Sequence, residues 1–200
     1  MMNKYYLLSW KNSAQTASAI YNSEDQIAHE LIPKLKGKNS LPFNFILKRI
    51  KEGKNKIIID NNLEELEEIW LDYLPNGFAW PLMSEKLKSV IQINLMKNEH
   101  IDWIECKVNK GNEERLYYVL RFNKMLDVLD MEETSFVRGT DHIIRPVFSY
   151  SKIKDYNIFV KPSSHDLWRI PSGFYVSEKL KKEIEKEKLT GLDFSKVPVV

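Results

Sequence analysis

The residues best suited to acid–base chemistry in this 200-residue chain are its histidines and one pair of closely spaced aspartates. Two carboxylates held together, such as those of Asp127 and Asp130, can exchange a proton with a substrate. The histidines are His29, His100, His142 and His165. Two of them have an aspartate as a direct neighbour, but side chains of adjacent residues rarely face one another. The pattern favours solvated loop histidines, and a hydrolase that uses His142 or His165 with Asp127 or Asp130 is the alternative.

Metal, nucleotide and acyl-transfer chemistry lack their usual sequence signatures. No His-x-x-x-His or Glu-x-x-His spacing offers two metal ligands on one helix face. The seven glycines form no phosphate-binding loop, and no Gly-x-Ser-x-Gly motif is present. Cys106 is the single cysteine and lies in a strand-like run, so we predict a buried, unreactive thiol. We therefore expect no metal, no cofactor and no enzymatic activity.

The overall charge is nearly balanced, with 30 basic and 28 acidic residues and a net charge of +2. Proteins dedicated to nucleic acids usually carry a strongly basic domain, so nucleic-acid binding is disfavoured. One local exception lies between residues 34 and 56, where eight Lys or Arg residues accompany a single acid, Glu52. A solvated basic surface is the favoured interpretation, and a basic patch that contacts nucleic acid is a second alternative.

The apolar runs of the chain are short. The run at residues 5–8 is too short for the apolar part of a signal peptide. No stretch approaches the roughly 20 apolar residues that cross a bilayer. We expect a cytoplasmic protein without membrane contact.

The sequence Ser-Glu-Lys-Leu-Lys occurs twice, at residues 84–88 and 177–181. Each copy follows an apolar run, and a serine hydroxyl can accept a hydrogen bond from a free N–H in the first helical turn. The pattern thus predicts a helix over 85–96 and another over 178–188, with Gly191 placed to end the second. Two interpretations of the repeat stay open. The dissimilar flanks favour chance and shared capping chemistry over an internal duplication.

Hydrophobic periodicity predicts the main elements between these two sites. Asn62 and Glu65 resemble a capping box, and the apolar residues over 63–74 fall on one helical face. Alternation over 104–108 and 116–122, around a turn at 109–112, predicts a β-hairpin.

These elements together predict an α+β fold. We expect a mixed or mainly antiparallel sheet, built from residues 100–160 and packed by the helices at 63–74 and 85–96. The side chains expected to be nearly buried are Leu66, Ile69, Leu87, Ile91, Leu116, Tyr118 and Leu120. We expect one domain over 1–200, which could divide into a helix-rich N-terminal lobe (1–98) and a strand-rich C-terminal lobe (99–200).

Three stretches form a set of motifs in a fixed order: Asp-Tyr-Leu-Pro-Asn at 72–76, the run at 80–87, and Leu-Thr-Gly-Leu-Asp-Phe at 189–194. In these motifs the chain resembles the Immunity protein 43 family of bacterial polymorphic-toxin systems. A related immunity family with the same closing pattern is the nearest alternative. The resemblance spans residues 70 to 195 and implies a cytosolic protein that binds and silences a cognate toxin. It implies no catalytic residues and no particular oligomeric state.

Residues 60–72 form the densest run of one charge, because several acids occur there without a basic residue. Many toxins of such systems act on nucleic acids through basic clefts, which an acidic surface would attract. Acids near a helix start also favour the helix dipole, which accounts for Glu64 and Glu65 better than for later ones. The predicted partner-binding residues are therefore Glu67, Glu68 and Asp72. Trp168 is added as an aromatic anchor, because no alternating pattern around it predicts burial.

Overall fold

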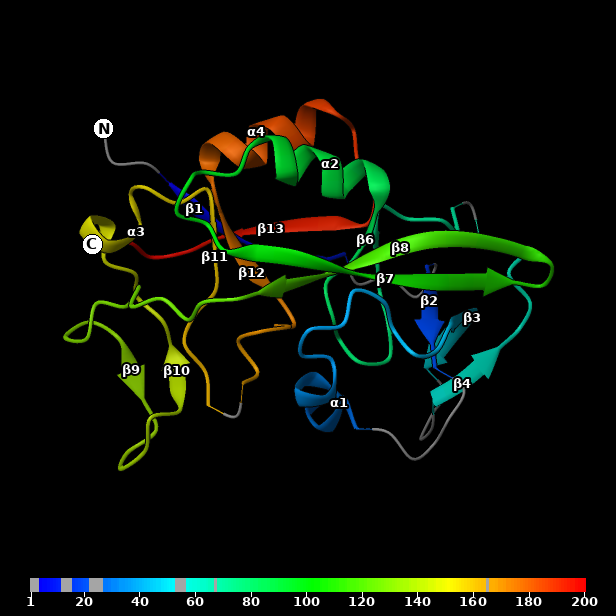
Figure 1. Cartoon of the computed structure of the whole chain (residues 1–200), viewed down its shortest axis with the longest axis horizontal. Helices are drawn as coiled ribbons and strands as arrows, with labels where there is room; N and C mark the ends of the chain where they lie inside the picture. The colour runs from blue at the N-terminus through cyan, green and yellow to red at the C-terminus, as the bar shows by residue number, and fades with distance from the viewer. Residues whose placement is uncertain (1–3, 12–15, 22–26, 53–56, 67, 165) are drawn as a thin grey trace.

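The computed structural model describes residues 4–11, 16–21, 27–52, 57–66, 68–164 and 166–200. Within these ranges the chain forms three β-sheets and four short helices (Figure 1). The first half contains β1 (Tyr5–Trp10), β2 (Ala17–Ile20), α1 (Ala28–Lys34), β3 (Phe45–Glu52), β4 (Ile57–Asp60), β5 (Tyr73–Leu74), β6 (Leu82–Ser84) and α2 (Glu85–Ile93). The second half contains β7 (Ile101–Lys110), β8 (Glu113–Phe122), β9 (Ser135–Phe136), β10 (Ile143–Arg145), α3 (Tyr150–Ile153), β11 (Ile158–Phe159), β12 (Phe174–Ser177), α4 (Glu178–Lys186) and β13 (Leu192–Lys196).

The largest sheet has the order β2-β3-β7-β8-β6-β5, and β4 pairs with β3 beside this path. Its strands are antiparallel except for β3 and β7, which run parallel. The sheet closes on itself, because the Ala19 N–H donates to the Pro75 carbonyl (2.8 Å) and the Gly77 N–H donates to the Ala19 carbonyl (3.0 Å). Closure supplies hydrogen-bond partners to strands that would otherwise be edges. The near-barrel encloses a core that includes Phe45 and Val119.

The second sheet has the order β11-β12-β1-β13, with antiparallel neighbours throughout. It inserts β1, from the start of the chain, between two strands from the end. Helices α2 and α4 lie side by side over the sheets (Figure 1) and bury Leu87 and Leu180 in a core shared by both sheets. A third core, with Tyr5 and Phe148, fills the other face of the second sheet.

The two sheets share one repeated unit. In the first unit (residues 71–122) the order is β5-β6-β8-β7 with α2 after β6, and in the second unit (156–199 with β1) it is β11-β12-β1-β13 with α4 after β12. Ser84 lies opposite Tyr117, as Ser177 lies opposite Tyr5. This register aligns Tyr-Tyr-Val-Leu at 117–120 with Tyr-Tyr-Leu-Leu at 5–8. It also aligns Ile-Asp-Trp at 101–103 with Leu-Asp-Phe at 192–194.

The two predicted helix caps are confirmed, and their surroundings match. The hydroxyls of Ser84 and Ser177 each accept a hydrogen bond, at 3.2 Å, from the backbone N–H three residues later. Each hydroxyl also donates to the residue before the first strand of its unit, Asp72 Oδ1 (2.6 Å) or Asn157 Oδ1 (2.7 Å). The copies of Ser-Glu-Lys-Leu-Lys thus occupy equivalent positions, which the chance interpretation does not explain.

The predicted helix over 63–74 is wrong. Residues 64–65 form a turn, 73–74 form β5, and the rest of the described segment is irregular. Leu63 and Leu66 are nevertheless buried in the barrel core, so their helix-like spacing reflects burial rather than a helix. Ile69 is half-buried against the same core instead of nearly buried.

The broad α+β prediction and the mainly antiparallel sheet are confirmed, but sheets dominate and the helices are short. The 104–122 hairpin is confirmed as β7 and β8, although several of their partner strands come from outside residues 100–160. Leu66, Leu87, Ile91, Tyr118 and Leu120 are buried as predicted. Leu116 is 44% exposed, because it lies toward the hairpin turn where α2 and α4 do not cover β8.

Both sheets combine strands from the two halves of the chain. The single-domain organisation, with its division at residues 98 and 99, stays a prediction. Among the helices of the described residues, none has the length and apolar character needed to span a bilayer.

Candidate functional site

Asp72, one of the predicted partner-binding residues, connects the two units. Its Oδ1 accepts from the Ser84 hydroxyl, and its Oδ2 accepts from the Thr190 N–H at 2.9 Å. The Ser84 N–H also donates to the Asp72 carbonyl at 2.8 Å. Both carboxylate oxygens are therefore engaged inside the protein, and the side chain is only partly exposed.

The other three predicted partner-binding residues lie in different settings. Glu68 is exposed on the irregular segment before β5, and Glu67 lies outside the described residues. Trp168 is only 7% exposed and belongs to the shared core, so the prediction of an uncovered ring is wrong. The Arg169 guanidinium lies 4.3 Å from the Trp168 ring centre. Within the described part of the chain, no hydrogen bond or ion pair joins Glu68, Asp72 and Trp168 to one another.

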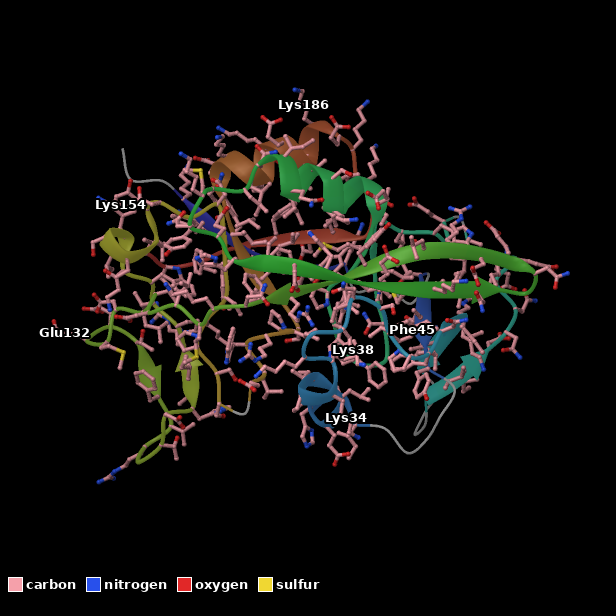
Figure 2. All side chains as sticks on the ribbon, viewed as in Figure 1. Lys34, Lys38, Phe45, Glu132, Lys154 and Lys186 are labelled. Atoms are coloured by element: carbon pink, nitrogen blue, oxygen red, sulfur yellow. The ribbon has the colours of Figure 1, made fainter. Side chains whose placement is uncertain are left out.

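The acidic segment lies against part of the basic segment. Arg49 Nη1 of β3 is 2.5 Å from Glu65 Oε2, so one of the eight basic residues is paired within the protein. Lys34 and Lys38 are exposed at α1 and the loop after it (Figure 2). This arrangement fits the favoured interpretation, a solvated basic surface, for the residues that the structure describes.

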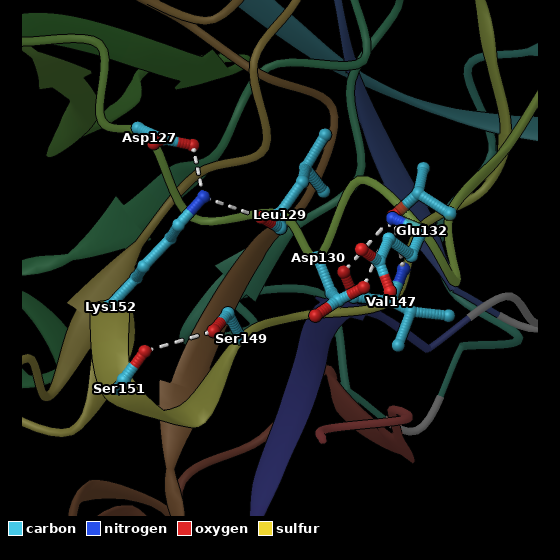
Figure 3. Close-up of polar contacts among 9 residues, drawn as sticks. Asp127, Leu129, Asp130, Glu132, Val147, Ser149, Ser151 and Lys152 are labelled. Carbon is cyan, nitrogen blue, oxygen red and sulfur yellow. Dashed lines mark hydrogen bonds and ion pairs between the residues drawn. The ribbon is translucent and has the colours of Figure 1, made fainter.

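The carboxylates of the alternative hydrolase have structural partners (Figure 3). Asp127 Oδ1 lies 2.9 Å from Lys152 Nζ, which also donates to the Leu129 carbonyl, and the Asp127 side chain is 76% exposed. Asp130 Oδ1 accepts from the N–H groups of Glu132 and Glu133 at 3.1 and 3.0 Å. These contacts stabilise the loop between β8 and β9, and among the described residues no histidine bonds to either carboxylate.

Of the two histidines in the hydrolase alternative, the structure describes His142. The His142 backbone N–H donates to Thr140 Oγ1 in an exposed turn, and His165 lies outside the described residues. In the described ranges, no group of three or more His, Cys, Asp or Glu side chains is arranged to hold a metal ion. Cys106 is buried, and burial raises the pKa of its thiol well above the usual range, as expected for an unreactive cysteine.

The projecting β9–β10 hairpin and the loop before it carry several exposed apolar residues. Strands β9 and β10 extend from the body below α3 (Figure 1). Ile144 is 64% exposed and Met131 is 62% exposed, and Val137 is also exposed. The base of the hairpin is fixed, because Thr134 Oγ1 donates to the Val147 carbonyl and accepts from the Val147 N–H, both at 3.1 Å. Apolar side chains that project from a fixed base suit a protein contact.

A pocket of about 280 Å³ lies where the two equivalent strand-connecting loops meet. Phe78 and Trp80 come from the loop between β5 and β6, and Lys161 and Trp168 come from the loop between β11 and β12. Ile32 of α1 forms another wall. Sequence reasoning missed this pocket because its walls come from three distant segments. The signal that could have found it is the repeat, which makes the two loops equivalent.

Glu99 is a carboxyl group whose pKa is raised by its surroundings in the folded protein. Its carboxylate accepts from the backbone N–H groups of Met96, Asn157 and Ile158. Burial nevertheless raises the pKa of Glu99, because the lost hydration outweighs these hydrogen bonds. Glu99 therefore serves as a junction between the loop after α2 and the start of β11.

Comparison with known protein families matches residues 21–199 to the Immunity protein family (Imm11). The match covers most of the chain and includes all of the first unit and most of the second. It supports the predicted kind of family, immunity proteins, but not the Immunity protein 43 family itself. No curated protein matches the chain.

Proposed function

Because the chain belongs to the Imm11 family of immunity proteins, we propose that it is a non-enzymatic inhibitor that binds and neutralises a cognate protein toxin. The observation that carries this proposal is the family match over residues 21–199. A bacterial polymorphic-toxin system and a cytoplasmic location are part of the proposal. Imm11 replaces the family number suggested by the sequence motifs.

The arrangement of side chains supports inhibition by binding. Asp127 and Asp130 are engaged in loop-stabilising contacts rather than gathered in a cleft. Exposed apolar residues on the β9–β10 hairpin instead provide the type of side chain that protein interfaces bury.

The predicted partner-binding residues remain proposals within this function. Glu67 and Glu68 are proposed to attract a basic toxin surface, because exposed charges mainly accelerate association. Asp72 would act mainly by fixing the preceding acidic segment, since its carboxylate is bonded internally. Trp168 would contact a partner only through the rim of the pocket that it lines.

Co-expression with the toxin gene next to this gene tests the function. Cells that make the toxin alone should stop growing, whereas cells that also make this protein should grow and yield a co-purifying complex. Leu180→Asp provides a control, because it places a charge in the shared core and should abolish protection along with folding. Growth arrest despite a folded, abundant protein would contradict the proposal.

A further inference from the structure

In the first unit, an earlier segment of the chain covers the edge of β7 that faces away from β8. The Leu41 N–H donates to the Glu105 carbonyl, and the Glu105 N–H donates to the Asn39 carbonyl, both at 2.8 Å. Farther along, Phe45 pairs with Val108 in parallel. Residues 39–45 therefore run alongside β7 in the parallel direction, through a bridge at Ser40 and then the start of β3 at Phe45.

The second unit begins the same arrangement and does not complete it. Phe148 pairs with Val199 in parallel, at the position where Phe45 pairs with Val108, and both phenylalanines are fully buried. The residues before Phe148 then turn away, because Ile143–Arg145 pair with β9 in the projecting hairpin. The segment that would cover the rest of β13 is thus used elsewhere.

As a result of this difference, the backbone of Lys196 lacks a neighbouring strand on its outer side among the described residues. Lys196 lies opposite Tyr6, as Glu105 lies opposite Tyr118 in the first unit. The neighbouring Val197 N–H donates to the Tyr5 carbonyl (3.1 Å), so by antiparallel alternation the N–H and C=O of Lys196 point to the outer edge.

Within the part of the chain that the structure describes, no hydrogen bond reaches these two groups from outside the sheet. Both Ser195 and Lys196 are exposed. Phe194, the next residue whose backbone points outward, has its N–H satisfied by Asp193 Oδ1 at 2.9 Å. The outer edge of β13 over residues 193–196 therefore offers the free N–H of Lys196 and free backbone carbonyls. At the start of this edge, the N–H of Phe194 is already bonded.

We propose that the outer edge of β13, residues 193–196, accepts an extended segment of the toxin as an added strand parallel to β13. This inference rests on the proposed function. Main-chain hydrogen bonds supply affinity when a peptide adds to a sheet edge, and side-chain pockets supply specificity. The protein's own segment at β7 indicates the chemistry of the occupant: polar residues at the positions of Asn39 and Ser40, then an apolar residue at the position of Leu41.

The short length of this edge favours the toxin over a second copy of the chain. Pro198 ends it, and Asp193 blocks one donor at its start. A contact of this length is far below the roughly 1,200 Å² that stable interfaces bury, so the partner must add contacts elsewhere. The β9–β10 hairpin supplies exposed apolar residues for a toxin, and it belongs to residues 123–155, the segment between the two units that leaves β13 uncovered.

Lys196→Pro tests the edge, because it removes the outward N–H and leaves the bond between Val197 and Tyr5. With the purified, catalytically inactive toxin domain encoded by the neighbouring gene, the variant should bind about tenfold or more weakly. Lys186→Ala on α4 is the charge control, since it removes one exposed lysine far from any strand edge, and its Kd should change less than about twofold. Circular dichroism and Tm should confirm that both variants fold.

Amide hydrogen exchange gives a readout that does not depend on a variant. The Lys196 amide should exchange rapidly in the free protein and about tenfold or more slowly in the toxin complex. The Glu105 amide, already bonded to Asn39, should exchange slowly in both states.

The outcomes separate this inference from the function on which it rests. A complex that protects the cell but leaves Lys196 exchange and Lys196→Pro binding unchanged would overturn the edge and keep the function. Protection of the Lys196 amide by self-association without toxin would identify a second copy as the occupant and overturn the toxin assignment. Absence of any complex with the toxin would overturn both.

Discussion

The first and second units contain the same arrangement of four strands and one helix, yet they complete their sheets differently. In the first unit, the inserted residues 11–70 supply β3 beside β7 and β2 beside β5, which closes a barrel. In the second unit, the inserted residues 123–155 cover one sheet face with Val128, Leu129 and Phe148 but leave the β13 edge open. The repeated unit supplies stability in both places. The insertions determine which backbone groups remain available to a partner.

The junctions of the two units are also alike in position and different in charge. The N–H groups of Asp72 and Tyr73 donate to the Thr190 hydroxyl and carbonyl oxygens. The equivalent N–H groups of Asn157 and Ile158 donate to the Glu99 carboxylate. Each junction therefore contacts the loop after the other unit's helix, so the two units stabilise one another.

The largest expected effects come from equivalent core residues of the two units. Leu120→Ala and Leu8→Ala should each lower the free energy of unfolding by about 2–5 kcal/mol, because both side chains are fully buried. Urea denaturation measures both. Leu116→Ala is the control, since this exposed leucine on the same strand should cost at most about 0.5 kcal/mol. A large loss for only one of the two buried leucines would break the equivalence.

The helix caps should show a smaller effect. Ser84→Ala and Ser177→Ala should each cost about 1–2 kcal/mol, because each removes a cap and leaves a hydrogen-bond acceptor of Asp72 or Asn157 without its donor. Thermal or urea unfolding measures the loss. Ser149→Ala at α3 is the matched control, because its side chain makes no capping hydrogen bond and its loss should be smaller. Equal losses at all three serines would contradict the capping role.

Replacing Glu99 should change how the free energy of unfolding depends on pH. We expect this change to be smaller than the loss caused by removing a helix cap. Burial raises the folded-state pKa of Glu99, so its protonated form fits the fold better than its charged form. Its contribution is therefore complete below the ordinary glutamate pKa and is lost as pH rises through the raised value. Glu99→Gln should flatten this decline in denaturation measured across mildly acidic pH.

Thr190→Ser supplies the control at the other junction. It changes the contact with Asp72 without adding an ionisable group, so the wild-type dependence on pH should remain. An unchanged pH slope in Glu99→Gln would assign the dependence to another group.

The smallest expected effect concerns association with the toxin. Charge reversal at Glu67 and Glu68 should slow association by a few-fold at low salt and weaken its salt dependence, since exposed charges act mainly on the encounter rate. Stopped-flow mixing measures the rate. Reversal of Glu183, a partly exposed acid on α4, provides a comparison. Unchanged kinetics in the folded 67/68 variant would remove the acidic segment as a contact surface.

Local signals in the sequence were sufficient for several elements. Alternation around residues 109–112 predicted β7 and β8, and burial does alternate along β7. In β8, residues 117–122 are all buried, because one face meets the barrel core and the other meets the core under the helices. Ser84 and Ser177 predicted helix starts, since capping depends on residues only a few positions away.

Tertiary contacts account for the main failures. Leu63 and Leu66 have helical spacing but are buried by the barrel core, while Arg49 from a distant strand pairs with Glu65. Trp168 lacks a local burial pattern because the two connecting loops and α1 surround it. No window of neighbouring residues contains this information, so the expectation of an uncovered Trp168 ring was wrong for the same reason.

The repeated segments are visible in the sequence, but they do not occur in the same order in the two units. Tyr-Tyr-Leu-Leu at 5–8 and Tyr-Tyr-Val-Leu at 117–120 were present, as were Leu-Asp-Phe and Ile-Asp-Trp. β8 is the last strand of the first unit along the chain. Its counterpart β1 precedes all the other elements of the second unit. A search for copies in one fixed order therefore misses the correspondence between residues 5–8 and 117–120.

The position of β1 has a consequence for biosynthesis. β1 leaves the ribosome before β12 and β13, the strands with which it pairs, have been made. Translation proceeds at about 5–20 residues per second, so β1 waits roughly 10–40 seconds for its partners. All strands of the first unit are complete by Phe122, so that unit can form while the second is unfinished. Because β13 follows the other described strands along the chain, a nascent chain acquires its proposed toxin-binding edge only after the strands of the first unit are complete.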